Sequence, residues 1–413
     1  MGKFQSFFKN SFNFLVVIAA LGYFVDIYDL VLFGMLRAPS LTSLGLSGPE
    51  LLESGIQLFN LQMIGMLVGG ILWGILGDKK GRLAVLFGSI LLYSVANIAN
   101  GFVHDVTWYG VCRFLAGIGL AGELGIGVTL VSETISRHYR GYGVMMIACV
   151  GIMGALVAGY LSQHFDWRVN YFIGGGLGLA LLILRLGAYE SGLFNRLLKQ
   201  THVSRGDFIS LFTNFSRFSR YVLCILIGLP IWYMVGILVT FSPEFAAALN
   251  VVGNVSAAQA ITFCYTGLVI GDFASGMLSQ LLKTRRKIIL LFMVMSCLSV
   301  VATLLSVRIT ADQFYILCFV MGISAGYWAL FVTVAAEQFG TNLRATVTTT
   351  VPNFVRGSVV ILTILLTMLK SHMTIVNAGL WIGGFTFAIG FIALLGLRET
   401  FGRDLDFVED TRM

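Results

Sequence analysis

The sequence places two carboxylates inside a stretch that is otherwise apolar and long enough to cross a bilayer. Asp26 and Asp29 lie in the segment GYFVDIYDLVLFGM, which begins at Gly22. A charge at the centre of a membrane helix costs about 2.5 to 3.5 kcal/mol, so two such acids call for a compensating function. Because residues three apart on a helix are separated by about 60°, both side chains are expected to face one central cavity. Burial and mutual repulsion are expected to let at least one of the two bind and release a proton. The alternative is that one of them pairs with a structural cation or caps a neighbouring helix.

Charged residues also interrupt two later apolar runs. Arg113 needs an acidic partner, because an unpaired guanidinium in a membrane helix is as costly as an aspartate. Glu123 follows about 15 Å further along the helix and is expected either to line the same cavity or to form an interhelical hydrogen bond. Arg356 comes after Pro352 and has no acid in its own run, so its planar fork is the candidate for binding an anionic substrate group. A lipid phosphate or a backbone carbonyl is its alternative partner, and Asn353 is assigned to the same substrate site.

Composition defines the class of protein that must position these residues. Of the 413 residues, 57% are hydrophobic and only 11% are charged, and the mean hydropathy is +0.88. The apolar runs extend to about 20 residues without two-residue alternation, which favours membrane helices over barrel strands. The sequence therefore predicts an all-α membrane protein with twelve transmembrane helices. The runs are centred near Val25, Val68, Leu92, Gly119, Gly151, Leu177, Ile231, Ile270, Met295, Ala325, Val360 and Phe387.

Basic residues predict the orientation of the chain in the membrane, because Lys and Arg collect in cytoplasmic loops. If the N-terminus is inside, most of the 27 Lys and Arg residues fall in the termini and the even-numbered loops. Only Arg37, Arg168, Arg308 and Lys370 then lie on the outer side. Both termini are therefore expected to be cytoplasmic. The net charge of +7 is a signal of topology and no indication of nucleic-acid binding.

The chain divides into two halves of six predicted helices each. A long polar stretch near the middle defines the predicted domains, which are residues 1–189, a cytoplasmic linker at 190–217, and residues 218–413 with a short cytoplasmic tail. Glu133 and Arg140 recur as Glu337 and Arg344, at an offset of 204 residues. Repeats with an even number of helices keep the same orientation, so a pseudo-twofold axis along the membrane normal is expected to relate the two bundles.

Several motifs give the sequence a family resemblance. The segment GDKKGR, from Gly77 to Arg82, resembles the loop signature G-x-x-x-D-[RK]-x-G-[RK] of the major facilitator superfamily, and RFLAGIGLAGELGIG resembles its fourth-helix signature. The segments DIYD and AGE, with Arg113 between them, resemble the metabolite-proton symporters and their sugar-porter-like branch. Two departures separate the chain from the sugar porters proper. Gln280 stands where the first half has Asp78, and the signature P-E-S-x-R appears only as YESGLFNR.

The resemblance implies roles for further residues. Asp29 matches the helix-one aspartate that couples protons in sugar porters, and a proton on it would release Arg113. Helices one, seven and ten line the cavity in this superfamily, and two or three of their aromatic residues are expected to touch substrate. The candidates are Tyr23, Tyr28, Trp232, Tyr233, Tyr327 and Trp328. The loop motifs are expected to form a cytoplasmic gate between the halves, with topology determination as the alternative. The gate candidates are Asp78, Lys80, Arg82, Glu133, Arg137, Arg140, Glu337 and Arg344.

Secondary active transport is the function that these observations favour. We expect proton-coupled uptake of a small organic metabolite, a carboxylate or a zwitterion, by a monomer in a bacterial inner membrane. A proton-driven exporter of a drug or siderophore, and a membrane receptor that does not transport, are the alternatives. Catalysis is disfavoured because no cluster of nucleophile, base and orienting group is visible. The six cysteines and five histidines do not have the spacing of metal ligands, so no metal or cofactor is expected.

Overall fold

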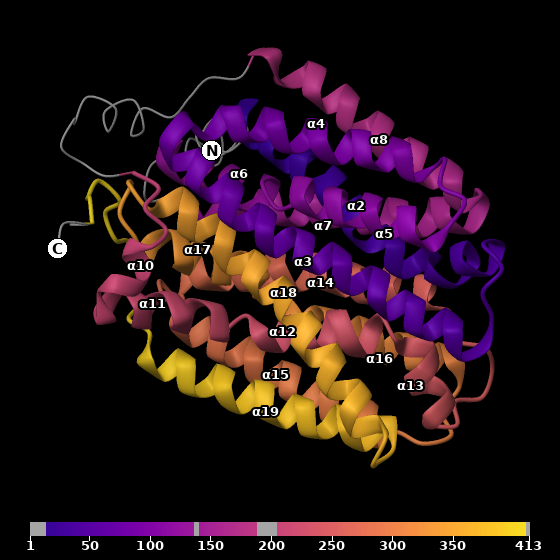
Figure 1. Cartoon of the computed structure of the whole chain (residues 1–413). Helices are drawn as coiled ribbons and strands as arrows, with labels where there is room; N and C mark the ends of the chain where they lie inside the picture. Colours follow the sequence, from indigo (N-terminus) through magenta and orange to yellow (C-terminus); the bar gives the residue numbers. More distant parts are fainter. Residues whose placement is uncertain (1–13, 136–139, 188–204, 410–413) are drawn as a thin grey trace, which may run out of the picture.

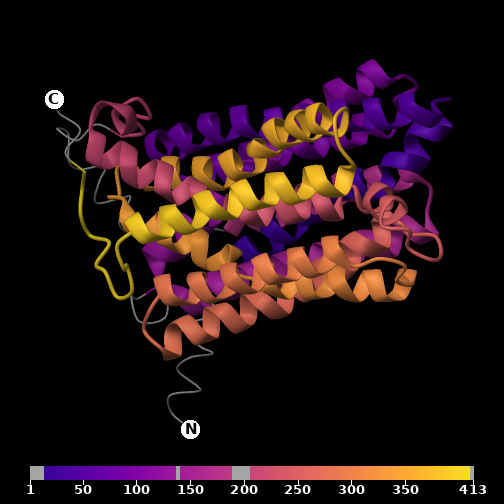
Figure 2. The same cartoon turned by 90° about the horizontal axis from the view of Figure 1, so that it is seen from below.

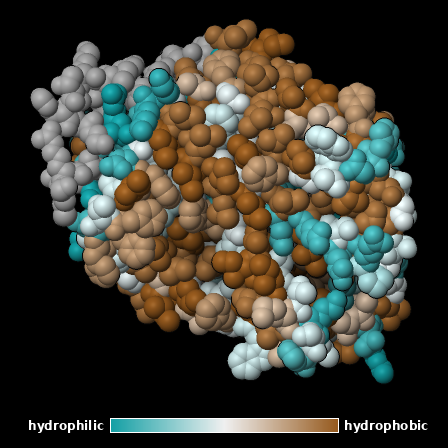
Figure 3. Space-filling model, in the orientation of Figure 1, coloured by the Kyte–Doolittle hydropathy of each residue, from teal (hydrophilic) through white to brown (hydrophobic). Residues whose placement is uncertain are grey.

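The part of the chain that the structure describes contains twelve spans that are long and apolar enough to cross a membrane. The computed structural model describes residues 14–135, 140–187 and 205–409. Each of the twelve spans contains the centre of one predicted run, so the predicted all-α membrane fold is confirmed. Exposed large apolar side chains cover these helices, among them Leu298, Trp381 and Leu395. Figure 3 shows hydrophobic residues over most of one face, as a surface in contact with lipid requires.

Each half contributes six spans, some of which are broken into shorter helices. The first half consists of α2 (Phe14–Ser43), α3 (Gly48–Lys80), α4 (Arg82–Asn100), α5 (Val106–Leu120), α6 (Glu123–Thr134), α7 (Arg140–His164), α8 (Trp167–Leu184) and the short helix η1 (Arg185–Gly187). The second half consists of α10 (Ser210–Thr213), α11 (Phe215–Leu226), α12 (Leu229–Tyr233), the π-helix η2 (Met234–Val239), α13 (Ser242–Ala248), α14 (Ala257–Leu281), α15 (Arg286–Leu305), α16 (Ala311–Ala325), α17 (Trp328–Gln338), α18 (Arg344–Lys370) and α19 (Ile375–Gly396). Residues 188–204, in the predicted linker, lie outside the described residues. The predicted domain boundaries stay predictions, although α11 begins three residues before the expected boundary at 218.

The two halves pack face to face. In Figure 1 the helices of the first half, in indigo to magenta, lie above those of the second half, and Figure 2 shows the molecule from the side of the second half. Across the interface α3 packs against α18, and α7 packs against α14. The second helix of each half therefore meets the fifth helix of the other half. This is the arrangement that a pseudo-twofold axis between parallel repeats produces.

Glycine allows two helix pairs to approach closely within the halves. A Cβ atom at Gly69 of α3 would lie 2.3 Å from the carbonyl oxygen of Ile118 on α5. In the second half, a Cβ atom at Gly271 of α14 would lie 2.1 Å from the carbonyl oxygen of Ile323 on α16. Only glycine permits these contacts, as is usual where membrane helices pack by their backbones. Both approaches lie where a span is broken, between α5 and α6 and between α16 and α17.

Candidate substrate and proton site

The two aspartates of α2 contact different halves of the protein. Both side chains are fully buried. Asp26 Oδ2 lies 3.7 Å from Nη2 of Arg356 on α18, in the second half. Asp29 Oδ1 lies 3.7 Å from Nη1 of Arg113 on α5, in the first half. The expectation of one shared sector is therefore corrected, because a rotation of about 60° around α2 is enough to turn Asp29 from the interface into its own bundle. The expected contact of Arg113 with Asp29 is present, and the proton-coupling roles stay predictions.

Arg113 is surrounded by polar and aromatic groups of the first bundle. Its guanidinium donates a hydrogen bond to Asn97 Oδ1 on α4 and lies 4.5 Å from the ring centroid of Tyr171. The hydroxyl groups of Tyr171 and Tyr109 share a hydrogen bond of 2.9 Å. Together with Asp29, these partners compensate the buried cation. Arg113 therefore belongs to the interior of the first bundle and not to the cavity between the halves.

Glu123 forms a bidentate ion pair with Arg185, a residue that the sequence analysis did not single out. Arg185 Nη2 lies 2.6 Å from Glu123 Oε2, and Nη1 lies 2.9 Å from Oε1. Ser89 on α4 donates a third hydrogen bond to Oε1. Arg185 directly follows an apolar run. In the sequence it therefore resembles a loop residue at the end of a membrane helix. These contacts correspond to the interhelical alternative for Glu123, whose proton-coupling role stays a prediction.

The Glu123–Arg185 pair packs directly against α2. A Cβ atom at Gly22 would lie 2.0 Å from Arg185 Nη2 and 2.5 Å from Glu123 Oε2. Gly22 precedes Asp26 by one helical turn, so the pair and the carboxylate lie on the same side of α2. The Glu123–Arg185 pair, Asp26 and the Asp29–Arg113 pair thus follow one another along this one helix.

Arg356 and four aromatic side chains surround a small cavity between the halves. The lining residues are Tyr23, Ile27, Ile231, Trp232, Val235, Tyr265, Leu268, Trp328 and Arg356. The cavity holds about 20 Å³ of water-accessible space, which is room for about one or two water molecules. The guanidinium carbon of Arg356 lies 5.5 Å from the ring centroid of Trp328 and 5.8 Å from that of Trp232. Trp328 Nε1 also donates a hydrogen bond of 2.9 Å to the Tyr23 hydroxyl. The site therefore combines one cation with several flat aromatic surfaces.

Three of the six aromatic candidates lie elsewhere. The hydroxyl groups of Tyr28, Tyr233 and Tyr327 donate to backbone carbonyl oxygens inside one half or the other. They do not line the cavity, because helical position alone does not decide which face of a span meets the opposite half. The cavity residues Tyr265 and Leu268 on α14 were missed, and nothing in their residue types distinguishes them from packing residues.

Asn353 supports Arg356 and also touches the first half. Its Oδ1 accepts a hydrogen bond of 3.3 Å from Arg356 Nη1. Its Nδ2 donates to the carbonyl oxygen of Ala121, at the break between α5 and α6, over 2.8 Å. Asn353 is absent from the cavity lining, so the structure places it behind Arg356. Its assignment to substrate binding stays a prediction.

Asp78 joins the halves at one end of the interface, which we call the network face. The network face consists of Asp78, Arg82, Glu133, Arg344 and Thr346. Asp78, on α3, accepts hydrogen bonds from the backbone nitrogen and hydroxyl of Thr346, over 2.8 and 2.7 Å. The nitrogen of Ala345 donates a third, over 3.2 Å. These nitrogens belong to the first turn of α18, where N–H groups lack partners within the helix and the helix dipole favours an anion. Asp78 thus caps a helix of the opposite half.

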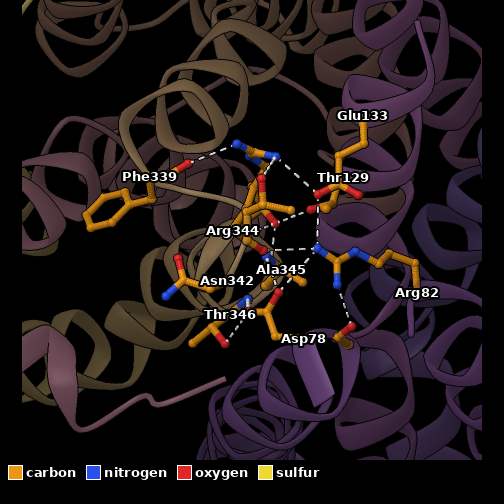
Figure 4. Close-up of polar contacts among 12 residues, drawn as sticks. Asp78, Arg82, Thr129, Glu133, Phe339, Asn342, Arg344, Ala345 and Thr346 are labelled. Atoms are coloured by element: carbon orange, nitrogen blue, oxygen red, sulfur yellow. Dashed lines mark hydrogen bonds and ion pairs between the residues drawn. The ribbon is translucent and has the colours of Figure 1, made fainter. Parts of the chain in front are cut away.

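A chain of ion pairs continues the network face, as Figure 4 shows. Arg82 lies 3.4 Å from Asp78 and 2.9 Å from Glu133. Arg344, from the second half, lies 3.1 Å from the same oxygen of Glu133. All four side chains are fully shielded from solvent. Because Glu133 bridges arginines of both halves, separation of the halves at this face would break the Glu133–Arg344 ion pair and the hydrogen bonds of Asp78 to α18.

The remaining gate candidates differ from the expected arrangement. Glu337 was expected to act with Arg344 as the second half's counterpart of the Glu133 network. It forms an ion pair with Arg285, at 3.3 Å. Lys80 is exposed at the end of α3. Arg137 and the side chain of Arg140 lie outside the described residues. Glu337 lies near the end of α17 as Glu133 lies near the end of α6, and the gating roles of these residues stay predictions.

The opposite face of the interface carries a second bridge. Arg37 Nη2, on α2, lies 2.6 Å from Glu244 Oε1, on α13, and the guanidinium lies 4.7 Å from the ring centroid of Phe241. Nearby, the Thr363 hydroxyl donates to Asn60 Oδ1 over 3.0 Å. In the sequence, Arg37 was only a marker of orientation. Contacts between the halves therefore exist on both sides of the cavity.

Comparison with known proteins identifies the family. A model described as the Major Facilitator Superfamily matches residues 19–363. The chain belongs to the Major Facilitator Superfamily. As a member of this superfamily it is a membrane transporter and not an enzyme.

Relatives with recorded substrates cover different shares of the chain. A niacin transporter of Acinetobacter baylyi is 33% identical over 165 residues, which are 39% of this chain and 37% of that protein. A probable 4-methylmuconolactone transporter of Cupriavidus pinatubonensis is 26% identical over 79% of this chain and 76% of its own length. The solved structure of the proton:xylose symporter XylE bound to 6-bromo-6-deoxy-D-glucose covers 96% of this chain and 98% of that chain, with a TM-score of 0.73 at 16% identity. The last match shows a shared fold.

Proposed function

We propose that this superfamily member is a proton-coupled importer of a small carboxylate with a flat or aromatic body. The observation that carries the proposal is the contact of Asp26 with Arg356 at the cavity between the halves. The distance of 3.7 Å is that of an ion pair without a hydrogen bond. Neither oxygen of Asp26, nor Nη2 of Arg356, has a hydrogen-bond partner among the described residues. A substrate carboxylate can therefore form a better contact with Arg356 than Asp26 does.

Competition for Arg356 would couple substrate binding to proton binding. When a carboxylate takes Arg356, Asp26 is left as a buried charge without a counterion. A proton on Asp26 removes that charge, and the formal charge of the cavity is then the same as before binding. Transport would combine one proton with one monocarboxylate and would be electroneutral. Asp29 and Arg113 would form a second pair, inside the first bundle, and a proton on Asp29 would release Arg113.

The aromatic surfaces favour a flat substrate. Trp232, Trp328 and Tyr23 lie around the cation, and such rings bind flat apolar groups by stacking. The niacin transporter among the relatives agrees with a small ring that carries a carboxylate. The cavity must widen to admit it, because its present space suits about two water molecules. We place the network face on the cytoplasmic side of a bacterial inner membrane, as the distribution of basic residues indicates.

Uptake by proteoliposomes tests the proposal. An inside-alkaline gradient should drive accumulation of nicotinate, while nicotinamide, the matched neutral amide, should not accumulate. Accumulation should not change when a potassium diffusion potential is imposed, because the cycle moves no net charge. Accumulation of both compounds alike, or a strong response to the potential, would contradict the competition mechanism.

Three variants test the roles of the individual residues. Asp26→Asn and Asp29→Asn should each abolish proton-driven accumulation but retain exchange of labelled for unlabelled substrate, since an amide keeps the shape and cannot titrate. Arg356→Lys retains the charge but loses the fork, and should weaken carboxylate binding by about 1 kcal/mol or more, which is at least about fivefold. Full affinity in the lysine variant would remove Arg356 from the substrate site.

A further inference from the structure

Asp272 is a buried carboxylate that neither the substrate cavity nor the networks between the halves explain. It lies in α14, within the apolar segment VIGDFASG, and its side chain is fully buried. No ion pair to Asp272 occurs within the described ranges 14–135, 140–187 and 205–409. An uncompensated charge at such a position is expensive. A specific contact must therefore justify it.

That contact is the start of a neighbouring helix. Asp272 Oδ1 accepts a hydrogen bond of 3.1 Å from the backbone nitrogen of Ala329, the second residue of α17. The tenth span is broken between α16 and α17, so α17 begins inside the protein with N–H groups that have no partner within the helix. Gly326, at the break, touches the backbone of Gly271, where an added Cβ would lie 2.2 Å away. This close approach places the carboxylate at the positive end of α17.

The helix that Asp272 caps carries a wall of the substrate cavity. Trp328, the first residue of α17, lies over Arg356 and donates to the Tyr23 hydroxyl. Leu268, one turn before Asp272 on α14, lines the same cavity. Asp272 therefore lies behind this wall, where it can fix the position of Trp328 without touching the cavity.

The corresponding break in the first half has a contact of another kind, which involves the opposite half. The break between α5 and α6 corresponds to the break between α16 and α17, and there the carbonyl oxygen of Ala121 accepts from Asn353 of the opposite half. Asp272 and α17 instead belong to the same half. A movement of the halves against each other would disturb the contact of Asn353 but not that of Asp272.

We propose that Asp272 is a positioning residue that holds α17 and Trp328 in one arrangement throughout the transport cycle. It acts as a hydrogen-bond acceptor and partner of the helix dipole, and it takes no part in proton coupling. The inference rests on the proposed function only in taking the cavity as the substrate site. The proposal predicts that an acceptor at position 272 matters more than a charge.

Three variants test this role. Asp272→Asn keeps an acceptor oxygen, whereas Asp272→Ala removes it. Thr374→Ala is the matched control, because Thr374 caps α19 by accepting from the nitrogen of Asn377 and lies away from the cavity lining. Hydrogen–deuterium exchange of peptides that cover the starts of α17 and α19 reports the caps without any substrate. KM and Vmax for nicotinate uptake, measured across pH, report the effect on the site.

In Asp272→Ala we expect exchange at the start of α17 to become at least tenfold faster and KM to rise at least tenfold, with little change in Vmax. Asp272→Asn should stay within threefold of wild type in both the exchange rate and KM, and Thr374→Ala should speed exchange only in α19.

Unchanged exchange at the start of α17 in Asp272→Ala would show that Asp272 does not cap α17, whatever the substrate proves to be. Faster exchange with unchanged KM would overturn the link to Trp328. An Asp272→Asn protein that exchanges substrate but no longer accumulates it would overturn the exclusion from proton coupling. If the wild-type protein does not transport nicotinate, the proposed function fails. The hydrogen–deuterium exchange data still show whether Asp272 caps α17.

Discussion

The change Asp78→Asn should shift the balance between the two open forms of the transporter. Asp78 accepts three hydrogen bonds from the first turn of α18, and these bonds exist only while the network face is closed. Hydrogen bonds to a charged group contribute about 1.5 to 3 kcal/mol, and neutral ones about 0.5 to 1.5 kcal/mol. An asparagine keeps the shape but replaces one acceptor oxygen with a donor. We therefore expect the closed face to lose about 2 kcal/mol, which is about 30-fold in population.

Cysteine labelling measures this shift. Thr349 is fully buried on α18, where Gly125 of the first half packs against it, and Ile56 lines a pocket at the opposite face beside Glu244. In Asp78→Asn, an impermeant maleimide should label Thr349→Cys about 30-fold faster and Ile56→Cys more slowly. Asp105→Asn, which changes an aspartate outside the interface, is the matched control. A change below threefold at Thr349→Cys, or faster labelling at Ile56→Cys, would refute the assignment of Asp78 to a gate.

Three further predictions concern the other charged contacts. Glu244→Gln should favour opening at the opposite face and speed labelling of Ile56→Cys about tenfold, since it removes the charged partner of Arg37. The double variant Arg37→Glu with Glu244→Arg should restore the wild-type labelling rate. Failure of that rescue would show that the Arg37–Glu244 pair does not hold this face closed. Glu123→Gln should lower the free energy of unfolding by about 3 to 5 kcal/mol, because it removes the counterion of the buried Arg185 and leaves neutral acceptors such as the carbonyl oxygen of Leu86. An unchanged thermal transition in detergent would contradict this. Burial raises the pKa of Glu399, but hydrogen bonds from the Thr284 hydroxyl and three backbone N–H groups outweigh it and hold the pKa below its ordinary value. The stabilisation of the folded protein by ionised Glu399 is present above about pH 4.3 and is lost as the pH falls through the lowered pKa. The difference in Tm between wild type and Glu399→Gln should therefore disappear in acid. A difference in Tm that persists in acid would show that ionisation of Glu399 is not its cause.

Local sequence signals identified the charged groups better than their partners. Asp26, Asp29, Arg113 and Arg356 are conspicuous because each interrupts an apolar run. The family resemblance implied the pairing of Arg113 with Asp29. The pairing of Arg356 could not be read from the sequence, since Arg356 has no acid in its own span and meets Asp26 across 330 residues of chain. Asp272 carried the same signal as Asp26, an isolated acid in an apolar run, and was overlooked. Arg185 carried a weaker signal, because a cation at the end of a run resembles a loop residue.

The sequence by itself determined the membrane class, the twelve spans and the repeat. These properties follow from segment-long apolarity and from residue spacing, which need no information about neighbouring helices. Equivalent positions in the repeat, such as Glu133 and Glu337, were also visible in the sequence.

Only the tertiary structure decided which face of each helix meets the opposite half. A residue on a buried helix can face its own bundle or the interface, and a rotation of about 60° separates the two outcomes. Asp29 and Tyr28 turn into the first bundle, whereas Asp26 and Tyr23, on the same helix, turn toward the second. Helix packing sets that rotation through contacts distant in sequence, such as the approach of Gly22 to the Glu123–Arg185 pair.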